Sequence, residues 1–182
     1  MSELLDIVDD NDVVIGQAER DVAHAQGLTI RLVYVWFYTP GGEVILQRRS
    51  AHKEAYPNRL IATVSGHVGA GDSYLEAAIR ETEEETGVAV DTDALQFFGK
   101  IHRRTGEARH MTDGFRCVYI YPFAGRVEDL RVEAGEGAGF ELWQPHHLLK
   151  ALVESPDEFT PFAREPFTRE LIASIARDSD GA

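Results

Sequence analysis

The chain has 182 residues, 43% of them hydrophobic, which is long enough for one well-buried domain and short for two. Its 18 basic residues against 31 acidic ones give a formal net charge of -13, which repels polyanions and leaves no broad basic surface for nucleic acid. We therefore expect a single domain over residues 1–182 that forms no stable complex with nucleic acid.

The composition also argues against secretion and membrane insertion. The lone Cys117 cannot form an internal disulfide, and within "FRCVYIYPF" it is expected to be a small buried hydrophobe. The acidic N-terminus "MSELLDIVDDND" has no apolar core of signal-peptide length, and the apolar run "LVYVWFY" is too short to span a bilayer. The sequence predicts a cytoplasmic protein without a membrane segment.

The first part of the chain predicts two hairpins separated by a short helix. "DIVDDNDVVIGQAER" is typical of two strands around a turn at Asp9–Asp12, and "RDVAHAQG" of a helix that ends at Gly27. The strand-like runs "LTIRLVYVWFY" and "EVILQRR" flank a Pro-Gly-Gly turn, so we expect them to pair. A loop from Ser50 to Gly71 then leads to an acidic helix.

Further strands and two closing helices complete an α/β pattern. Strands are expected at about Leu95–Ile101, Arg116–Phe123 and Phe140–Trp143, with "KIHRRTGEARH" as a long loop. The helices, at about Pro145–Glu154 and Phe162–Ala176, are expected to pack on the domain as a C-terminal region at about 145–177. Strands interspersed with helices predict a mixed sheet between helical layers.

The acidic helix "SYLEAAIRETEEETGV" concentrates carboxylates on one face. Asp72 or Ser73 is a suitable N-cap and Gly87 a suitable end, while Leu75, Ile79, Thr82 and Thr86 form the expected buried stripe. With Leu75 at zero and about 100° per residue, Glu84, Glu81 and Glu85 lie at about 180°, 240° and 280°. Such oxygen ligands favour Mg²⁺ or Mn²⁺, and the alternative is a solvated acidic face.

The stretch around this helix resembles the signature of the Nudix hydrolases, G-x5-E-x7-R-E-U-x-E-E-x-G-U, where U is a bulky aliphatic residue. The positions that match without a gap are Gly66, Arg80, Glu81, Glu84, Glu85, Gly87 and Val88. Asp72 replaces the first glutamate, which shortens the reach of that carboxylate, and Thr82 replaces an aliphatic residue on the buried stripe.

The resemblance implies a Nudix-type α/β/α sandwich with a central mixed sheet, and an enzyme that hydrolyses a diphosphate linkage in a nucleoside diphosphate or a derivative of one. It implies that Glu81, Glu84 and Glu85 hold Mg²⁺ or Mn²⁺ and that Arg80 orients a glutamate of the cluster. Glu84 is also expected to be catalytic, because in many relatives a glutamate of the signature is the base that activates water. The substrate is then a small-molecule diphosphate. A homodimer is compatible with this family, although no sequence feature establishes one.

A narrower resemblance links "QAERDVAHAQGL", "ILQRRSAHKEAYPNRL" and "SGHV" to the Nudix branch that includes isopentenyl-diphosphate isomerase. His24 and His67 match metal histidines of that isomerase, but Ser65 stands in place of its cysteine, and a third histidine is missing near Ile30. Isomerisation needs an acid and a base on opposite faces of an alkene, and a serine is a poor substitute for the thiol. Isomerase chemistry remains a minor alternative.

Two further groups complete the predicted site. The same resemblance implies that Arg49 and Lys53 bind a diphosphate, the alternative being that both are exposed strand-end cations. The glycine-rich stretch "VEAGEGAGFELW" offers Glu133 and Glu136 as the base that activates water, with Glu136 preferred.

The sequence does not specify the substrate, and other classes of function stay open. Tyr56, Phe115 and Trp143 are candidates for stacking on a nucleobase, but each is equally suited to the core. A non-catalytic Nudix module that binds a nucleotide is the main alternative, and a protein-binding scaffold built on the C-terminal helices is another. The complete carboxylate cluster argues against the non-catalytic module.

Overall fold

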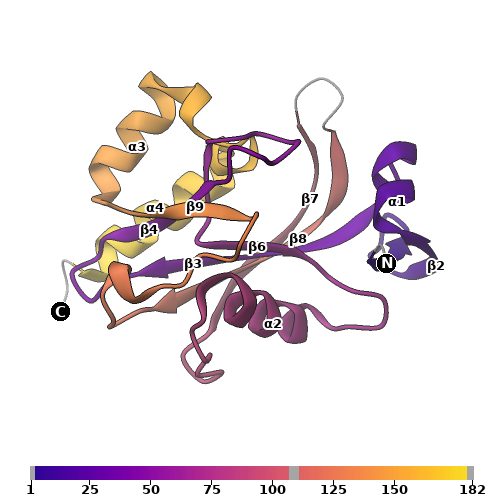
Figure 1. The fold of residues 1–182 in the computed structure, drawn as a ribbon, viewed down its shortest axis with the longest axis horizontal. Helices are drawn as coiled ribbons and strands as arrows, with labels where there is room; N and C mark the ends of the chain where they lie inside the picture. The colour runs from indigo at the N-terminus through magenta and orange to yellow at the C-terminus, as the bar shows by residue number, and fades with distance from the viewer. Residues whose placement is uncertain (1–2, 107–110, 180–182) are drawn as a thin grey trace.

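The computed structural model describes residues 3–106 and 111–179, and Figure 1 shows their path. An N-terminal hairpin and a short helix precede a central sheet, and two helices close the chain. The elements in order are β1 (Leu4–Val8), β2 (Val14–Glu19), α1 (Arg20–Gln26), β3 (Ile30–Tyr38), β4 (Val44–Arg49), β5 (Leu60–Ile61), β6 (Val64–His67), α2 (Tyr74–Thr86), β7 (Gln96–Thr105), β8 (Thr112–Pro122), β9 (Gly137–Trp143), α3 (Pro145–Glu154) and α4 (Pro166–Ser179).

Strand β3 is the centre of a seven-stranded mixed sheet. It runs parallel to β8 along its whole length, and β8 pairs antiparallel with β7. On its other edge, residues 32–35 pair with β6, while only Phe37 and Tyr38 pair with β4. Farther along β4, Gln47 and Arg48 pair with β5, while the opposite edge of β4 pairs with β9 along its whole length.

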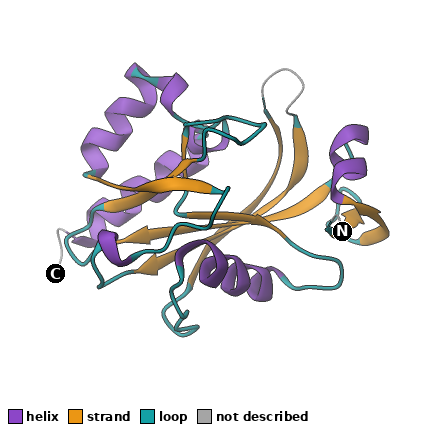
Figure 2. Ribbon diagram, viewed as in Figure 1, coloured by secondary structure: helices purple, strands orange, loops and turns teal. Residues whose placement is uncertain are grey.

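Helices cover both faces of the sheet, as the sequence predicts for an α/β/α sandwich (Figure 2). Alternate residues of β3 divide between two cores, because successive side chains of a strand point to opposite faces. Val33, Val35 and Phe37 share one core with Ala77 and Ala78 of α2. Tyr34 and Trp36 belong to the other core, whose helical side is formed by Leu148, Leu152, Leu171, Ile172 and Ile175 of α3 and α4.

Several expected elements are confirmed and three are corrected. The Pro-Gly-Gly hairpin forms, but only two residue pairs join its strands, because β6 occupies the rest of the β3 edge. The expected loop from Ser50 to Gly71 contains β5 and β6. Lys100–Thr105 is not a loop but the end of β7, paired with Thr112–Cys117 of β8, whereas residues 107–110 of the predicted loop lie outside the described residues.

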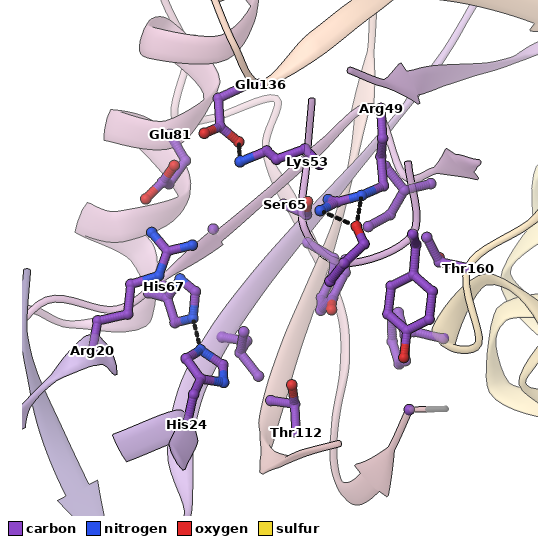
Figure 3. A pocket seen from close by; sticks show the side chains of 18 of the residues that line it. Arg20, His24, Arg49, Lys53, Ser65, His67, Glu81, Thr112, Glu136 and Thr160 are labelled. Carbon is purple, nitrogen blue, oxygen red and sulfur yellow. Dashed lines mark hydrogen bonds and ion pairs between the residues drawn. The ribbon is translucent and has the colours of Figure 1, made fainter. Parts of the chain in front are cut away.

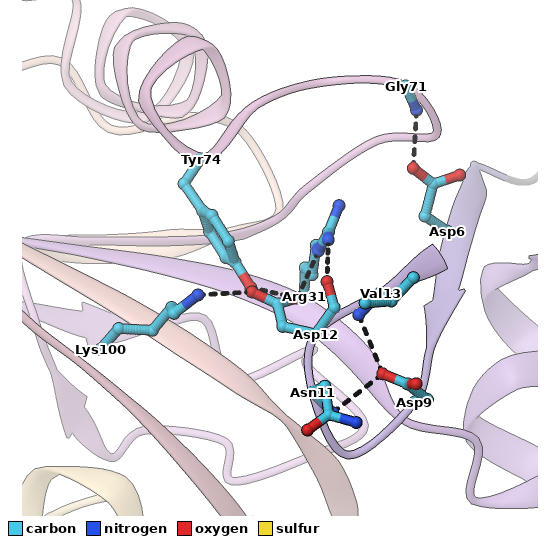
Figure 4. A network of polar contacts seen from close by, with 9 residues as sticks. All are labelled: Asp6, Asp9, Asn11, Asp12, Val13, Arg31, Gly71, Tyr74 and Lys100. Carbon is cyan, nitrogen blue, oxygen red and sulfur yellow. Dashed lines mark hydrogen bonds and ion pairs between the residues drawn. The ribbon is translucent and has the colours of Figure 1, made fainter. Parts of the chain in front are cut away.

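The N-terminal hairpin holds the start of α2 in place through a buried carboxylate, Asp12 (Figure 4). Asp12 accepts hydrogen bonds from Arg31 Nε at 2.6 Å, from Lys100 Nζ at 2.6 Å and from the hydroxyl of Tyr74, the first residue of α2, at 2.9 Å. Its side chain is 8% exposed, and these three donors hold its pKa below the usual value despite burial. Asp6 adds a second tie by accepting from the backbone N–H of Gly71 at 3.0 Å.

Replacing Asp12 by asparagine tests this clamp, because asparagine keeps the size of the side chain and tolerates the positive φ of 63° at this position. The substitution leaves the partly buried Arg31 without its counter-charge, so we expect the free energy of unfolding to fall by about 3 kcal/mol in denaturant titrations. Asp10→Asn, at an exposed position of the same turn, changes the net charge equally and is expected to stay within about 0.5 kcal/mol of wild type. Equal losses in both variants would contradict the role of Asp12.

Candidate active site

A cavity of about 860 Å³ opens beside β3, β6 and the end of α2 (Figure 3). Ser65 and His67 of β6 and Leu32 and Tyr34 of β3 lie in its wall. All the catalytic, metal-binding and substrate-binding residues expected from the sequence also line it: Arg49, Lys53, Arg80, Glu81, Glu84, Glu85 and Glu136. The fold therefore brings together residues from five separate parts of the chain: β3, the end of β4 with the loop after it, β6, α2 and the segment before β9.

Helix α2 begins and ends as its sequence predicts. Ser73 is the N-cap, and its hydroxyl accepts from the backbone of Glu76 while the Glu76 carboxylate accepts from the backbone of Ser73, which completes a capping box. Gly87 ends the helix with a φ of 71°. Both caps fix the length of α2, and with it the positions of the glutamates in its last two turns.

The buried face of α2 differs from the expected stripe. Leu75 is 43% exposed, whereas Glu85 is only 3% exposed. The small residues Ala77 and Ala78 face the sheet, so the side of the helix that approaches β3 and β6 is turned toward the glutamates. Thr82 is buried as expected, and its hydroxyl donates to the carbonyl of Ala78 at 2.7 Å.

Burial shifts the ionisation of two glutamates at this end of the cavity. Burial raises the pKa of Glu81 to about 7, although the Arg80 guanidinium acts in the opposite direction. Burial also raises the pKa of Glu85 well above its usual value, and the neighbouring Glu81 adds to the shift. Glu85 accepts hydrogen bonds from the Gln47 amide at 3.0 Å and from the backbone N–H of Ser65 at 3.4 Å.

Gly66 allows Glu81 to take its position. A Cβ atom on Gly66 would lie 2.0 Å from the carboxyl carbon of Glu81, so any larger residue would displace that carboxylate. In this chain, the first position of the Nudix signature is therefore a glycine because a side chain there would collide with Glu81.

Arg80 contacts the cluster directly. Its guanidinium lies 2.9 Å from Glu81 Oε1 and 3.0 Å from Glu84 Oε2, and it donates to the carbonyl oxygen of His67 at 3.1 Å. Glu84 is half exposed and Glu81 largely buried, so Arg80 joins an exposed carboxylate to a buried one. Asp72, at the first acidic position of the signature, is not among the residues that line the cavity.

Basic and acidic groups from outside α2 meet in the same cavity. Lys53 forms an ion pair with Glu136, and its side chain is only 18% exposed. Arg49 donates from Nε and Nη2 to the carbonyl oxygen of Ala55 at 3.1 and 2.9 Å, which fixes the loop after β4. Burial raises the pKa of Glu133, and the nearby Glu136 adds to the effect.

His24 and His67 bond to each other. Their Nε2 atoms are 2.9 Å apart and their rings meet edge to face, so one ring donates and the other accepts. Burial lowers the pKa of both imidazoles, with a further contribution from Arg20, which favours the neutral pair. Ser65 lies in the cavity wall with a hydroxyl where the isomerase has a thiol.

Glu81, Glu84 and Glu85 present carboxylate oxygens at this end of the cavity, and such oxygens are suitable ligands for a hard divalent cation. Among residues 3–106 and 111–179, no group of three or more His, Cys, Asp or Glu side chains converges on one point in the present rotamers. Arg80 engages Glu81 and Glu84 instead. A cation would therefore compete with the guanidinium for these oxygens.

Sequence reasoning overlooked part of the cavity. Arg116, Thr160 and Phe162 line it, and a lone arginine inside the apolar strand "FRCVYIY" was the available signal for the first of them. Of the three aromatic candidates, only Tyr56 lines the cavity. Phe115 stacks on His102 with ring centroids 4.4 Å apart, and Trp143 packs edge-on against Phe159.

The Nudix domain family matches residues 29–168 of this chain. The chain belongs to the Nudix family. It is 37% identical over 128 residues to an uncharacterized Nudix hydrolase of Yersinia pestis, covering 70% of this chain and 69% of that protein. It is 33% identical over 160 residues to the Nudix hydrolase YfcD of Shigella flexneri, covering 88% and 82% of the two chains.

One further relative matches about half of the chain, and one solved structure matches nearly all of it. A Nudix hydrolase of Streptomyces coelicolor is 52% identical over 87 residues, and this match spans 48% of each chain. The crystal structure of DR0079 from Deinococcus radiodurans superimposes with a TM-score of 0.71 at 27% identity, covering 95% of this chain and 99% of that one. These matches support the Nudix fold over nearly the whole chain.

No helix in the described part of the chain is long and apolar enough to cross a membrane.

The raised pKa of Glu81 predicts a pH dependence of stability in metal-free buffer. The unfolded side chain loses its proton near pH 4.5, whereas the folded one keeps it until about pH 7. The folded state therefore binds more protons between these values, so the free energy of unfolding falls as pH rises through this window and levels off above it. In Glu81→Gln, the decrease in the free energy of unfolding over this pH range should be smaller by ~3 kcal/mol. The decrease that remains is the contribution of Glu85.

Denaturant titrations from pH 4 to pH 8 in EDTA measure the effect. Glu83→Gln is the matched control, because Glu83 is exposed on the same helix, and its profile is expected to parallel wild type. A Glu81→Gln profile that also parallels wild type would show that Glu81 does not titrate differently in the folded state.

Proposed function

We propose that this Nudix protein hydrolyses a diphosphate linkage in a nucleoside diphosphate or a nucleoside diphosphate derivative with the help of Mg²⁺ or Mn²⁺. The observation that carries the proposal is that the buried Glu85 and the largely buried Glu81 share one cavity with three cations, Arg49, Lys53 and Arg80. A diphosphate bound by metal carries both negative charge and a cation, so it complements both kinds of group.

The buried carboxylates have a reason to bind a cation. Glu85 is bonded only to an amide and a backbone N–H, so its negative form lacks a positive partner among the described residues. Glu81, Glu84 and Glu85 are the proposed ligands, and binding of a cation there would drive their deprotonation. When bound, such an ion supplies charge neutralisation for the diphosphate and a more acidic water.

The cationic side chains have separate proposed roles. Lys53 and Arg49 lie where they can bind non-bridging phosphate oxygens, and Arg80 holds Glu81 and Glu84 in position when their oxygens are not fully used by metal. Lys53 pairs with Glu136 in the absence of substrate. A phosphate that draws Lys53 away would free the Glu136 carboxylate to accept a proton from water.

Two other functions are weaker fits to this cavity. A module that only binds a nucleotide has no need for two buried carboxylates of raised pKa beside a cationic wall. Isomerisation of isopentenyl diphosphate lacks its thiol, because Ser65 occupies that position, and the Nε2 atoms of His24 and His67 bond to each other.

The deciding experiment is hydrolysis of a panel of nucleoside diphosphates, nucleoside diphosphate derivatives and isopentenyl diphosphate with Mg²⁺ or Mn²⁺. We expect metal-dependent release of phosphate or a nucleotide, abolished by EDTA. Glu85→Gln is expected to lower kcat/KM by about a hundredfold or more, because the amide cannot serve as an anionic ligand. The same variant should fold normally, since burial raises the pKa of Glu85 and so favours its uncharged form, which the amide resembles.

Glu83→Gln again serves as the control, with activity within about twofold of wild type because exposed substitutions away from the site have small effects. If one compound binds tightly but none is cleaved, the protein is a binding module. If isopentenyl diphosphate is converted to its isomer, the hydrolase proposal fails.

A second pair of variants tests the base. Glu136→Gln is expected to lower kcat by about a hundredfold with a smaller effect on KM, as for loss of a general base. Glu133→Gln, in the same glycine-rich stretch and the same cavity, is the matched control and should retain most of kcat. The reverse ranking would assign the proton transfer to Glu133.

A further inference from the structure

A buried cation that no carboxylate among the described residues neutralises lies in the wall of the cavity. Arg116 of β8 is 1% exposed. Its Nη1 donates to the carbonyl oxygens of Arg103 and Gly114, and its Nη2 donates to the Thr105 hydroxyl at 2.7 Å and the Thr112 carbonyl at 3.2 Å. These four bonds to neutral groups fix the guanidinium but leave its charge uncompensated.

Two polar atoms in this part of the wall have no hydrogen-bond partner. They are Arg116 Nε and the hydroxyl of Thr160, a residue that is 3% exposed. Phe162, two residues after Thr160, has its ring centroid 5.4 Å from the guanidinium carbon of Arg116 and 4.2 Å from the ring centroid of Tyr34. A buried polar atom without a hydrogen-bond partner destabilises the fold, most of all on a charged group, so these two atoms call for an explanation.

These groups lie away from the carboxylates of α2. In Figure 3, Glu81 and Glu136 lie on one side of the cavity, and Thr112 and Thr160 lie on others. The cavity-lining residues that pair with or contact Arg116 are uncharged: Leu32, Thr105, Thr112 and Phe162. A substrate whose diphosphate meets Lys53 and Glu81 would extend its other half toward this wall.

The unpaired polar atoms of Arg116 and Thr160 determine which hydrogen-bonding groups that half of the substrate must carry. Phosphates and carboxylates are bound best by two parallel N–H groups of one arginine, but Arg116 has only Nε–H left. A single N–H suits a single carbonyl oxygen. The Thr160 hydroxyl can accept as well as donate, so it can accept from an N–H next to that carbonyl.

We propose that Arg116, Thr160 and Phe162 form a base-binding subsite for a ring with a lactam edge, a carbonyl beside an N–H, as in uracil, guanine and hypoxanthine. The inference rests on the proposed action on nucleoside diphosphates and names the substrate class within it. Adenine and cytosine present an amino group where the carbonyl is required, which brings N–H donors against the guanidinium. The aromatic rings of Phe162 and Tyr34 supply the apolar part of the wall.

Inosine and adenosine 5′-diphosphate are the matched probes, because they differ only in the 6-oxo, N1–H edge against the 6-amino, N1 edge. Titration calorimetry in EDTA measures their affinities without hydrolysis. We expect wild type to bind the inosine compound at least about tenfold more tightly, since one hydrogen bond to a charged donor accounts for a difference of this size. Kinetics with metal should show the same preference in kcat/KM.

Thr160→Val is the first variant, because the Thr160 hydroxyl has no protein partner to lose and valine has the same shape. We expect it to fold normally, to weaken inosine 5′-diphosphate binding about tenfold and to leave adenosine 5′-diphosphate binding unchanged. Arg116→Met is the second variant and should remove the preference entirely. If Arg116→Met does not fold, Thr160→Val decides alone.

Wild-type protein that binds the two compounds equally, or prefers adenosine, overturns the subsite, as does a Thr160→Val variant with an unchanged ratio. The two proposals fail separately. If the inosine compound binds preferentially but no nucleotide is hydrolysed, the hydrolase proposal fails and the subsite stands. If nucleotides are hydrolysed without any preference between the two bases, the subsite fails and the hydrolase proposal stands.

Discussion

The site depends on the close approach of α2 to the sheet, which removes two carboxylates from water. Ala77 and Ala78 permit that approach, and Gly66 leaves room for the Glu81 carboxylate beyond it. A buried carboxylate without compensation is expensive, and three features reduce the cost: proton uptake, the Arg80 contact with Glu81, and the amide and N–H bonds to Glu85. A bound cation would replace the protons on these carboxylates and the Arg80 contact, and this replacement is the basis of the proposed chemistry.

Local sequence signals predicted the local structure well. Ser73 and Gly87 end α2 through side-chain and backbone geometry that depends on only a few neighbouring residues, and the Nudix signature indicated which glutamates to examine. The helical wheel placed the buried stripe incorrectly, because a leucine at position 75 suggested a core position while the packing was decided by two alanines. Small residues carry little weight in a hydrophobicity pattern, although they determine how near two elements can lie.

Long-range features were beyond the reach of the sequence pattern. β6 is four residues long and contains Ser-Gly-His, so it has little strand character of its own and is stabilised by pairing with β3. The pairing of β9 with β4 is equally long-range, and it brings Lys53, after β4, and Glu136, before β9, together across 83 positions of sequence. Arg116 was overlooked for a similar reason, since only the fold reveals that a strand arginine has carbonyl partners and no carboxylate among the described residues.

The N-terminal hairpin lies outside residues 29–168, which the family shares, yet it supplies the carboxylate that joins β3, β7 and the first residue of α2. A domain boundary drawn from the family match alone would separate Asp12 from Arg31, Lys100 and Tyr74. The resulting fragment would contain every residue of the Nudix signature and still begin with unpaired cations around the start of its central helix. The structural unit of this chain therefore extends beyond residues 29–168 to include the N-terminal hairpin.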